Sequence, residues 1–324
     1  MTRETFEPVA QLKTISLEAL KGRSADEVSK LLTAAKEDGV FYLNIADDVQ
    51  LKSVTNDINW LSHSLFNMDE TEKLKFDVDK LGPYKLNGYK PVGRNVGGIK
   101  GQRDGFESYA ISSDHPAPPV IAQSQHHLDE FRSICLDLAQ VVFETLSIAC
   151  HLPDENSFQS CHSTSPLNLV RLLRYPGAMG NQTFSIPQTA HTDMGSLTFL
   201  FTNSPGLQIQ RAGSSEWLHV LPKTGHPIVN LGDAMKILSN SELQSVLHRV
   251  VSVPGGRAED RYSFAYLMRP EPSTLMAPLP GLGDTDGKSY HVPGLGHADE
   301  KSYNGEPVRT CEEWVTMKFR ALRG

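Results

Sequence analysis

A histidine and an aspartate stand two residues apart in the segment His191-Thr192-Asp193. Side chains at this spacing on a β-strand project from the same face, so an imidazole and a carboxylate can share one metal ion. Alone, the pair is a weak signal in a chain with 12 histidines, and a surface or hydrogen-bonded core histidine is the plain alternative. The interpretation as a metal site gains from His248, which lies downstream in the strand-like run 246–251.

Two histidines and one carboxylate leave an open coordination face, which suits a non-haem Fe(II) ion in oxygen chemistry. None of the four cysteines lies near His191 or His248 in the sequence, so a closed Cys/His zinc site finds no support. Arg261 and Ser263 form a second pair with strand spacing. Because a guanidinium binds a carboxylate through two parallel hydrogen bonds and a hydroxyl adds a donor, this pair could hold the distal carboxylate of a small diacid.

Short strands are the elements expected to position these residues. The region from 167 to 268 carries β-prone runs separated by Gly, Pro and Asn, at 167–174, 196–201, 207–211, 217–220, 227–231, 246–253 and 261–268. Many short strands without long helices between them are typical of an antiparallel sandwich or barrel.

Helical patterns flank this strand region. Apolar spacing predicts helices over 24–39, from 47 to 66, over 121–151 and from 310 to 319, with a strand at 40–45. Capping boxes are expected where Ser24 precedes Glu27 and where Thr310 precedes Glu313. The segments 81–105 and 270–308 are expected to be irregular loops that contact a ligand, the second as a lid.

Composition excludes several classes of protein. The chain has 324 residues, of which 39% are hydrophobic and 21% charged, so it is neither a disordered chain nor a disulfide miniprotein. Its net charge of -7 predicts no binding to nucleic acid or to an anionic membrane. The four cysteines are scattered, and the chain has neither an apolar signal region nor an apolar run of membrane length, so we expect a cytoplasmic protein. We also expect no obligatory protein partner.

In their order along the chain, the motifs resemble the isopenicillin-N-synthase-like branch of the Fe(II)- and 2-oxoglutarate-dependent oxygenases. The resemblance covers most of the chain. It is carried by Asp38-Gly39-Val40-Phe41-Tyr42, Arg174-Tyr175-Pro176, the run from His191 to Thr198, Gly206-Leu207-Gln208-Ile209, Val229-Asn230-Leu231-Gly232-Asp233, the run from Ser245 to Val250, and Arg261-Tyr262-Ser263.

The resemblance implies a role for six residues. His191, Asp193 and His248 would be the iron ligands, and Arg261 with Ser263 would bind the C5 carboxylate of 2-oxoglutarate. Tyr175 would also contact the co-substrate. Leu173 departs from the pattern, because plant relatives often have an asparagine there, so an ordinary core aromatic remains the alternative for Tyr175.

The resemblance also implies the fold and the division of the chain. We expect a mainly β protein with flanking helices and a double-stranded β-helix, or jelly-roll, core. Residues 1–120 would form a mixed α/β region packed on the core, and residues 121–324 the oxygenase core with the helix 121–151 and a C-terminal helix. Phe199, Tyr266 and Met268 are expected to face the iron. Asn230 and Asp233 could offer a partner for a ligating imidazole, with a purely structural turn as the alternative.

The implied enzyme is a dioxygenase that uses Fe(II), 2-oxoglutarate and O2 to oxidise a small organic molecule in specialised metabolite biosynthesis. Hydroxylation, desaturation and ring rearrangement all remain open as outcomes. Two alternatives also remain: a 2-oxoglutarate-independent iron oxidase of the same fold, and a catalytically silent jelly-roll protein in which the triad holds a metal structurally.

Overall fold

The computed structural model describes residues 8–81, 86–97, 99–112, 115–177, 186–252, 259–282, 302–303 and 306–321. Two β-sheets build the core. The larger sheet has the strand order β1-β2-β10-β7-β12-β5-β4-β3 and the smaller has the order β6-β11-β8-β9. The strands are β1 (Thr14–Ser16), β2 (Val40–Asn44), β3 (Gly88–Lys90), β4 (Glu107–Ile111), β5 (Leu169–Tyr175), β6 (Gln188–His191), β7 (Leu197–Thr202), β8 (Leu207–Gln210), β9 (Trp217–His219), β10 (Ile228–Leu231), β11 (Leu247–Val250) and β12 (Arg261–Met268).

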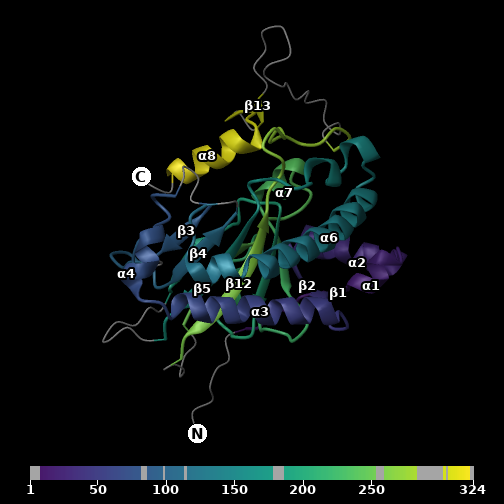
Figure 1. Ribbon diagram of the computed structural model, residues 1–324. Helices are drawn as coiled ribbons and strands as arrows, with labels where there is room; N and C mark the ends of the chain where they lie inside the picture. Colours follow the sequence, from purple (N-terminus) through teal and green to yellow (C-terminus); the bar gives the residue numbers. More distant parts are fainter. Residues whose placement is uncertain are drawn as a thin grey trace.

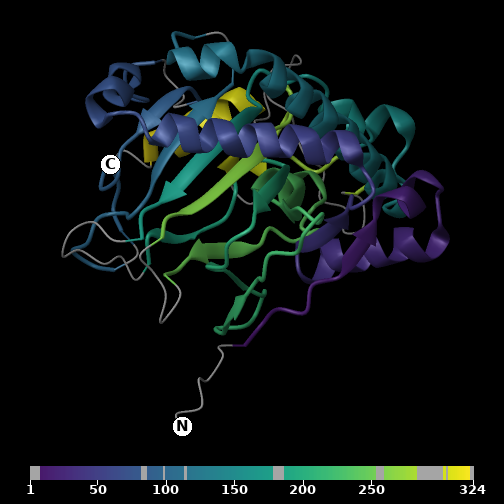
Figure 2. The same ribbon diagram turned by 60° about the horizontal axis from the view of Figure 1, so that its bottom comes forward.

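Two long helices cover the outer face of the larger sheet, as Figure 2 shows. They are α3 (Val49–Phe66) and α6 (Gln125–Ala149). Phe131 of α6 packs edge-on against Phe264 and Tyr266 of β12, with ring centroids 5.6 and 6.4 Å apart. The even-numbered residues of β12 therefore face the helices, and the odd-numbered residues face the smaller sheet.

The other helices are short or peripheral. In Figure 1, α8 lies near the top of the view and α3 near the bottom. The remaining elements are α1 (Leu17–Lys21), α2 (Ala25–Glu37), α4 (Glu70–Lys73), α5 (Pro119–Gln123), α7 (Asp233–Leu238), α8 (Cys311–Ala321), the 3-10 turns Leu74–Phe76, Asp154–Asn156 and Gln159–Cys161, and the two-residue strands β13 (Ser302–Tyr303) and β14 (Glu306–Pro307). No helix in the described part combines the length and apolar character that a membrane crossing needs.

The two facing sheets flanked by helices confirm the predicted fold class, and each predicted strand between 167 and 268 is present within a few residues of its expected bounds. Two local predictions are wrong. The segment 81–105 contributes the buried strand β3 to the larger sheet. The capping box at Ser24 is absent, because Ser24 makes no side-chain cap on α2 and Glu27 Oε1 accepts the backbone N–H of Ser16 rather than that of Ser24.

The expected helix 121–151 is divided at Ser124 into α5 and α6. At α8 the predicted capping box is present, because Thr310 N donates to Glu313 Oε2 and Glu313 N donates to Thr310 Oγ1. Most of the expected lid, residues 283–301, lies outside the described residues. The larger sheet draws strands from both sides of residue 120, and the division of the chain at that residue stays a prediction.

Candidate metal and co-substrate site

A cavity lies between the two sheets and collects the chemistry-bearing residues. All six residues singled out in the sequence line it: His191, Asp193 and His248 on one side, and Tyr175, Arg261 and Ser263 on another. Apolar side chains of both sheets, among them Leu200, Leu207, Ile209 and Leu267, make up much of the remaining wall. Apolar walls of this kind lower the local dielectric constant and strengthen electrostatic interactions with a molecule bound between them.

His191 and His248 meet because their strands are neighbours. His191 ends β6, His248 lies in β11, and the two residues stand opposite each other in the antiparallel register with ring centroids 4.3 Å apart. Asp193 Oδ1 lies 3.9 Å from the Nε2 atom of each imidazole. One ligand atom from each residue falls within 4.8 Å of the other two, a separation that one ion can bridge.

The two-residue spacing predicts that Asp193 lies on the same strand as His191. This prediction is wrong. Strand β6 ends at His191, and Asp193 follows in a turn. That turn is held by the backbone of the Gly232-Asp233 corner, because Asp233 N donates to Asp193 O at 2.8 Å. Gly232 is required there, since a Cβ would stand 2.5 Å from Asp193 O and 2.3 Å from the carbonyl oxygen of Gly195.

Hydrogen bonds orient the three donor groups toward a common point. The ring nitrogens Nδ1 of His191 and His248 donate to the carbonyls of Thr189 (2.8 Å) and Val246 (3.1 Å), which leaves each Nε2 with its lone pair facing Asp193. Gln188 Nε2 lies 3.3 Å from His191 Nε2. A metal ion at His191 would replace that amide as the partner of the lone pair.

The two oxygens of Asp193 have different partners. Oδ2 accepts hydrogen bonds from Thr198 Oγ1 (2.6 Å) and Asn230 Nδ2 (2.9 Å), while Oδ1 faces the imidazoles. The sequence suggests Asn230 as a partner for an imidazole, but in the structure its amide donates to the carboxylate of Asp193. Sequence reasoning missed Thr198, although its place in an expected strand directly after the His-x-Asp motif was a usable signal.

Electrostatics favour a divalent cation at this point. Burial lowers the pKa of His191 to about 4, so this imidazole is neutral at pH 7. Burial opposes ionisation of Asp193, but the two histidines and the Thr198 and Asn230 hydrogen bonds outweigh it and hold the pKa of Asp193 at about 2. An ionised carboxylate beside a neutral imidazole suits Fe(II), so the donor set fits the expected ion.

Arg261 and Ser263 lie side by side near the start of β12. Arg261 Nη1 donates to Ser263 Oγ at 3.3 Å, its Nε donates to Pro205 O at 3.0 Å, and its guanidinium carbon lies 4.8 Å from the centroid of the Tyr175 ring. The Tyr175 hydroxyl donates to Gln188 Oε1 at 2.6 Å. Gln188 therefore connects the aromatic ring beneath Arg261 to the imidazole of His191.

Three expected contacts are wrong. Phe199, Tyr266 and Met268 are buried in the cluster beneath the helices rather than facing the cavity. Their neighbours Thr198, Leu200, Ala265 and Leu267 line the cavity instead. Both faces of this sheet are buried, so strand alternation separates the two sets of residues without saying which set faces the site.

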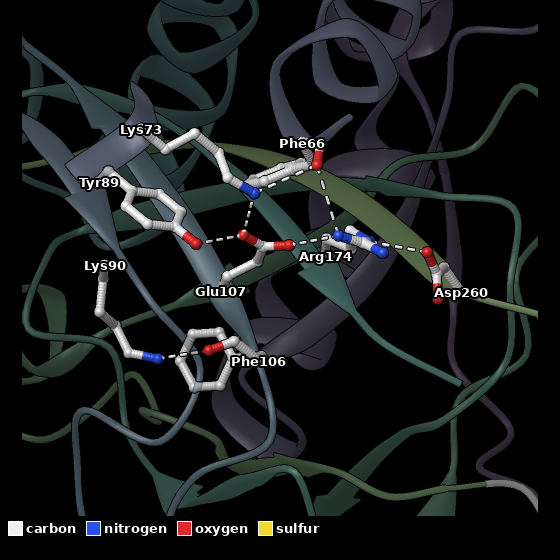
Figure 3. Close-up of polar contacts among 8 residues, drawn as sticks. All are labelled: Phe66, Lys73, Tyr89, Lys90, Phe106, Glu107, Arg174 and Asp260. Atoms are coloured by element: carbon white, nitrogen blue, oxygen red, sulfur yellow. Dashed lines mark hydrogen bonds and ion pairs between the residues drawn. The ribbon is translucent and has the colours of Figure 1, made fainter. Parts of the chain in front are cut away.

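A buried polar network supports the Arg261 end of the cavity from the helical side (Figure 3). The carboxylate of Glu107 accepts hydrogen bonds from Lys73 Nζ (2.8 Å), Tyr89 Oη (2.5 Å) and Arg174 Nη1 (2.6 Å). Arg174 Nε also donates to Asp260 Oδ2 at 2.7 Å. Because Arg174 precedes Tyr175 and Asp260 precedes Arg261, this network ties together the backbone segments that carry the predicted co-substrate residues.

Comparisons with known proteins identify relatives over nearly the whole chain. Residues 167–270 match the model of the 2OG-Fe(II) oxygenase superfamily. The 2-oxoglutarate-dependent dioxygenase gloE of Glarea lozoyensis is 33% identical over 289 residues, which cover 87% of this chain and 86% of that protein. The 2-oxoglutarate-dependent dioxygenase frbH of Dothideomycetidae sp. is 28% identical, with 90% and 91% covered.

Solved structures agree on the fold. A full-length protein of Neurospora crassa, solved in complex with alpha-KG, superimposes with a TM-score of 0.76 at 21% identity over 98% of both chains. A putative 2OG-Fe(II) oxygenase family protein from Caulobacter crescentus gives the same TM-score at 18% identity, over 97% of this chain and 100% of that one.

The chain therefore belongs to the 2OG-Fe(II) oxygenase superfamily. The superfamily, the jelly-roll fold and the class of enzyme predicted from the motifs are confirmed: this is a 2-oxoglutarate-dependent dioxygenase.

Proposed function

We propose that His191 Nε2, His248 Nε2 and Asp193 Oδ1 bind the Fe(II) ion, and that O2 is the oxidant consumed. The observation that carries the proposal is the convergence of these three atoms in one cavity, with their other polar atoms engaged elsewhere. Three protein ligands leave coordination positions open on the side of the cavity. When bound, Fe(II) together with 2-oxoglutarate supplies the activation of O2, and 2-oxoglutarate leaves as succinate and CO2.

Arg261 and Ser263 would hold the C5 carboxylate of 2-oxoglutarate. The guanidinium is buried, and its charge attracts an anion in surroundings where water competes little. Tyr175 would support the anchor through its ring beneath the guanidinium and would orient Gln188 through its hydroxyl. The apolar wall excludes water from the oxidation.

The substrate would be a small organic molecule, and the reaction a step of specialised metabolism; this last assignment is an analogy with the family. Support for a small substrate comes from the free volume of the cavity, about 70 Å³, from a relative named as a homoarginine-6-hydroxylase of Arabidopsis thaliana, and from a Neurospora crassa structure solved with thymine. The net charge of -7 argues against nucleic acid as the substrate.

Succinate formation from 2-oxoglutarate tests this proposal without knowledge of the substrate. Purified protein given Fe(II), ascorbate, 2-oxoglutarate and air should release succinate slowly, and the Asp193→Ala variant should release at least about a hundredfold less. Arg23→Met, which changes a side chain 73% exposed on the surface, should match the unmodified protein. Equal succinate from the Asp193→Ala variant, or none from the unmodified protein, would contradict the proposal and favour the oxidase or the silent fold.

A further inference from the structure

Gln188 places a side-chain amide directly beside the proposed iron position. It begins β6 and lines the cavity, and its Nε2 atom lies 3.3 Å from the Nε2 atom of His191. No motif in the sequence singled out this residue. An uncharged hydrogen-bonding group at the metal-facing nitrogen of an imidazole can influence what binds there without being a ligand itself.

An irregularity in β6 turns this side chain into the cavity. His248 of β11 stands opposite His191, and Val250, two residues further along β11, stands opposite Gln188, three residues back along β6. On a regular strand, side chains three residues apart point to opposite faces. The extra residue in β6 has the pattern of a β-bulge, which commonly re-aims a side chain next to an active site. It brings Gln188 and His191 to the same side.

Hydrogen bonds on both sides fix which end of the amide faces His191. The Tyr175 hydroxyl donates to Gln188 Oε1 at 2.6 Å. The Nδ1 atom of His191 donates to Thr189 O at 2.8 Å, so its Nε2 atom carries the lone pair and accepts from the Gln188 amide. The reverse orientation would set the amide oxygen against that lone pair. The N–H groups of Gln188 therefore point toward the proposed iron position.

Metal binding takes away the acceptor of this amide. An ion bound at Nε2 of His191 occupies the lone pair that accepts from Gln188, and Asp193 Oδ2 is already engaged by Thr198 and Asn230. A hydrogen-bond donor in an apolar cavity is costly when it has no acceptor. The ligands that complete the coordination of the ion bring new oxygen atoms to this place, and these are the acceptors that the amide would meet.

The position of Gln188 indicates which ligand supplies that oxygen. The Tyr175 ring lies beneath the Arg261 guanidinium, with 4.8 Å between the guanidinium carbon and the ring centroid, and the Tyr175 hydroxyl contacts Gln188. Gln188 thus stands between the co-substrate anchor and His191, beside the path that 2-oxoglutarate must follow from Arg261 to the metal. The anionic oxygen of a keto acid is also a stronger acceptor than a neutral ligand.

We propose that the Gln188 amide donates a hydrogen bond to the metal-bound keto-acid end of 2-oxoglutarate. The inference rests on the proposed function and adds a contact at the end of the co-substrate opposite to the Arg261 anchor. A molecule held by directional contacts at both ends has its orientation fixed as well as its position. Gln188 would therefore orient the chelating group, while Arg261 supplies most of the attraction.

Anaerobic binding measurements test this contact. Fe(II) affinity is measured first by competition with a chromogenic chelator, and 2-oxoglutarate is then titrated into the Fe(II)-saturated protein while the visible charge-transfer band is recorded. Gln188→Leu should weaken 2-oxoglutarate binding about tenfold. The band maximum should also shift, because the hydrogen bond changes the energy of the keto-acid orbital that receives the electron.

Fe(II) affinity should not fall in the Gln188→Leu variant. The amide is not a ligand, and in the metal-free protein it competes with the ion for the His191 lone pair. Gln210→Leu is the matched control, because Gln210 ends β8 in the same small sheet but does not line the cavity. This control should leave Fe(II) affinity, 2-oxoglutarate affinity and the band maximum unchanged.

Gln188→Glu separates the two contacts of the amide. The carboxylate keeps an oxygen for the Tyr175 hydroxyl but cannot donate, and its charge repels a keto acid. This variant should therefore bind 2-oxoglutarate at least as weakly as Gln188→Leu. Recovery of 2-oxoglutarate binding in the Glu variant would show that Gln188 only supports Tyr175, and would overturn the proposal.

Two further results would overturn the role of Gln188. One is an unchanged 2-oxoglutarate affinity or an unshifted band in Gln188→Leu. The other is a fall in Fe(II) affinity as large as the fall in 2-oxoglutarate affinity, which would indicate general damage to the site. The unmodified protein separates these failures from failure of the proposed function: if it forms no band, the proposed function fails, and if it forms the band, only the role of Gln188 is at stake.

Discussion

Among single residues, Asp193 is the one on which the geometry of the site depends most, because its two oxygens have different partners. Oδ2 is fixed by Thr198 and Asn230, and Oδ1 is thereby aimed at the two imidazoles. Loss of a group that orients a metal ligand in this way typically lowers metal affinity by about tenfold to a hundredfold. Thr198 and Asn230 are therefore positioning residues of the proposed iron site.

Removing the Thr198 hydroxyl tests this positioning. Thr198→Val keeps the shape of the side chain and loses the hydrogen bond to Asp193, so Fe(II) affinity should fall by about tenfold to a hundredfold. Thr198→Ser retains the hydroxyl and should lose much less. Competition with a chromogenic Fe(II) chelator measures the affinity for Fe(II). Equal affinities in the Val and Ser variants would contradict a positioning role for the Thr198 hydroxyl.

The Arg261 anchor makes a separate prediction. Arg261→Ala should raise the apparent KM for 2-oxoglutarate about tenfold to a thousandfold, equivalent to roughly 1.5–4 kcal/mol of lost charge-assisted hydrogen bonding. Arg261→Lys should recover part of this loss, since an ammonium group cannot donate two parallel hydrogen bonds. The measurement is succinate release at varied 2-oxoglutarate, and an unchanged KM in the Ala variant would refute the anchor.

At the scale of elements, the ends of β5 and β12 are held by charges buried between the sheet and the helices. The side chains of Lys73 and Glu107 are each only 4% exposed. The Glu107 carboxylate also accepts hydrogen bonds from Tyr89 and Arg174 (Figure 3). A buried charge is tolerated when it is paired and hydrogen-bonded, and becomes costly when one partner is lost. The network therefore makes this end of the sheet sensitive to single substitutions.

Glu107→Gln leaves the Lys73 ammonium without its buried countercharge. The free energy of unfolding should fall by about 3–5 kcal/mol. Glu72→Gln serves as the matched control, because Glu72 pairs with Lys75 on the surface at 50% exposure and should change stability by less than about 1 kcal/mol. Urea unfolding measures both variants, and equal small effects would mean that the network contributes little to stability.

Most of the strands that carry the site were predictable because Gly, Pro and Asn bound each β-prone run, whereas β6 lies outside the predicted runs. The buried strands β3 and β4 were not, since Lys90 and Glu107 look like solvated residues and their partners lie far away in the sequence. Motif order predicted the triad, whereas the orientation of its atoms required the hydrogen bonds of the fold.

At the scale of the whole molecule, the helical layer and the jelly-roll core meet around a buried histidine. His162 stacks on Phe143 of α6 at 4.2 Å, its Nδ1 donates to Phe158 O at 2.6 Å, and its Nε2 accepts from Ser196 Oγ at 2.5 Å. Burial lowers the pKa of His162 to about 4, so the ring is neutral in the folded protein. Ser196 follows Asp193 closely in the chain, which connects this contact to the site.

Folding stability should consequently fall in mild acid. In the unfolded chain His162 becomes protonated below its ordinary pKa of 6.5, whereas in the folded protein it stays neutral down to about pH 4. Its contribution to the free energy of unfolding is therefore fully present above pH 6.5 and is lost as the pH falls from 6.5 toward 4. Between about pH 7.5 and pH 5, His162 should account for about 2 kcal/mol of the decline in the free energy of unfolding.

Urea unfolding of the metal-free protein at both pH values measures this decline. The pKa of His191 is also lowered, and its contribution to the decline should be the same in the unmodified protein and in the variant. His162→Gln should reduce the decline by the share assigned to His162. An identical pH dependence in that variant would contradict the assignment.

Anaerobic titration with Fe(II) and then 2-oxoglutarate shows whether this cavity binds both. The unmodified protein should bind one equivalent of Fe(II) and develop the visible charge-transfer band of a keto acid chelated to Fe(II). Asp193→Ala should not form the band, and Arg261→Ala should form it only at much higher 2-oxoglutarate. Stoichiometric Fe(II) binding without the band, or a band that survives in Asp193→Ala, would contradict the assignment of this cavity as the site of Fe(II) and 2-oxoglutarate.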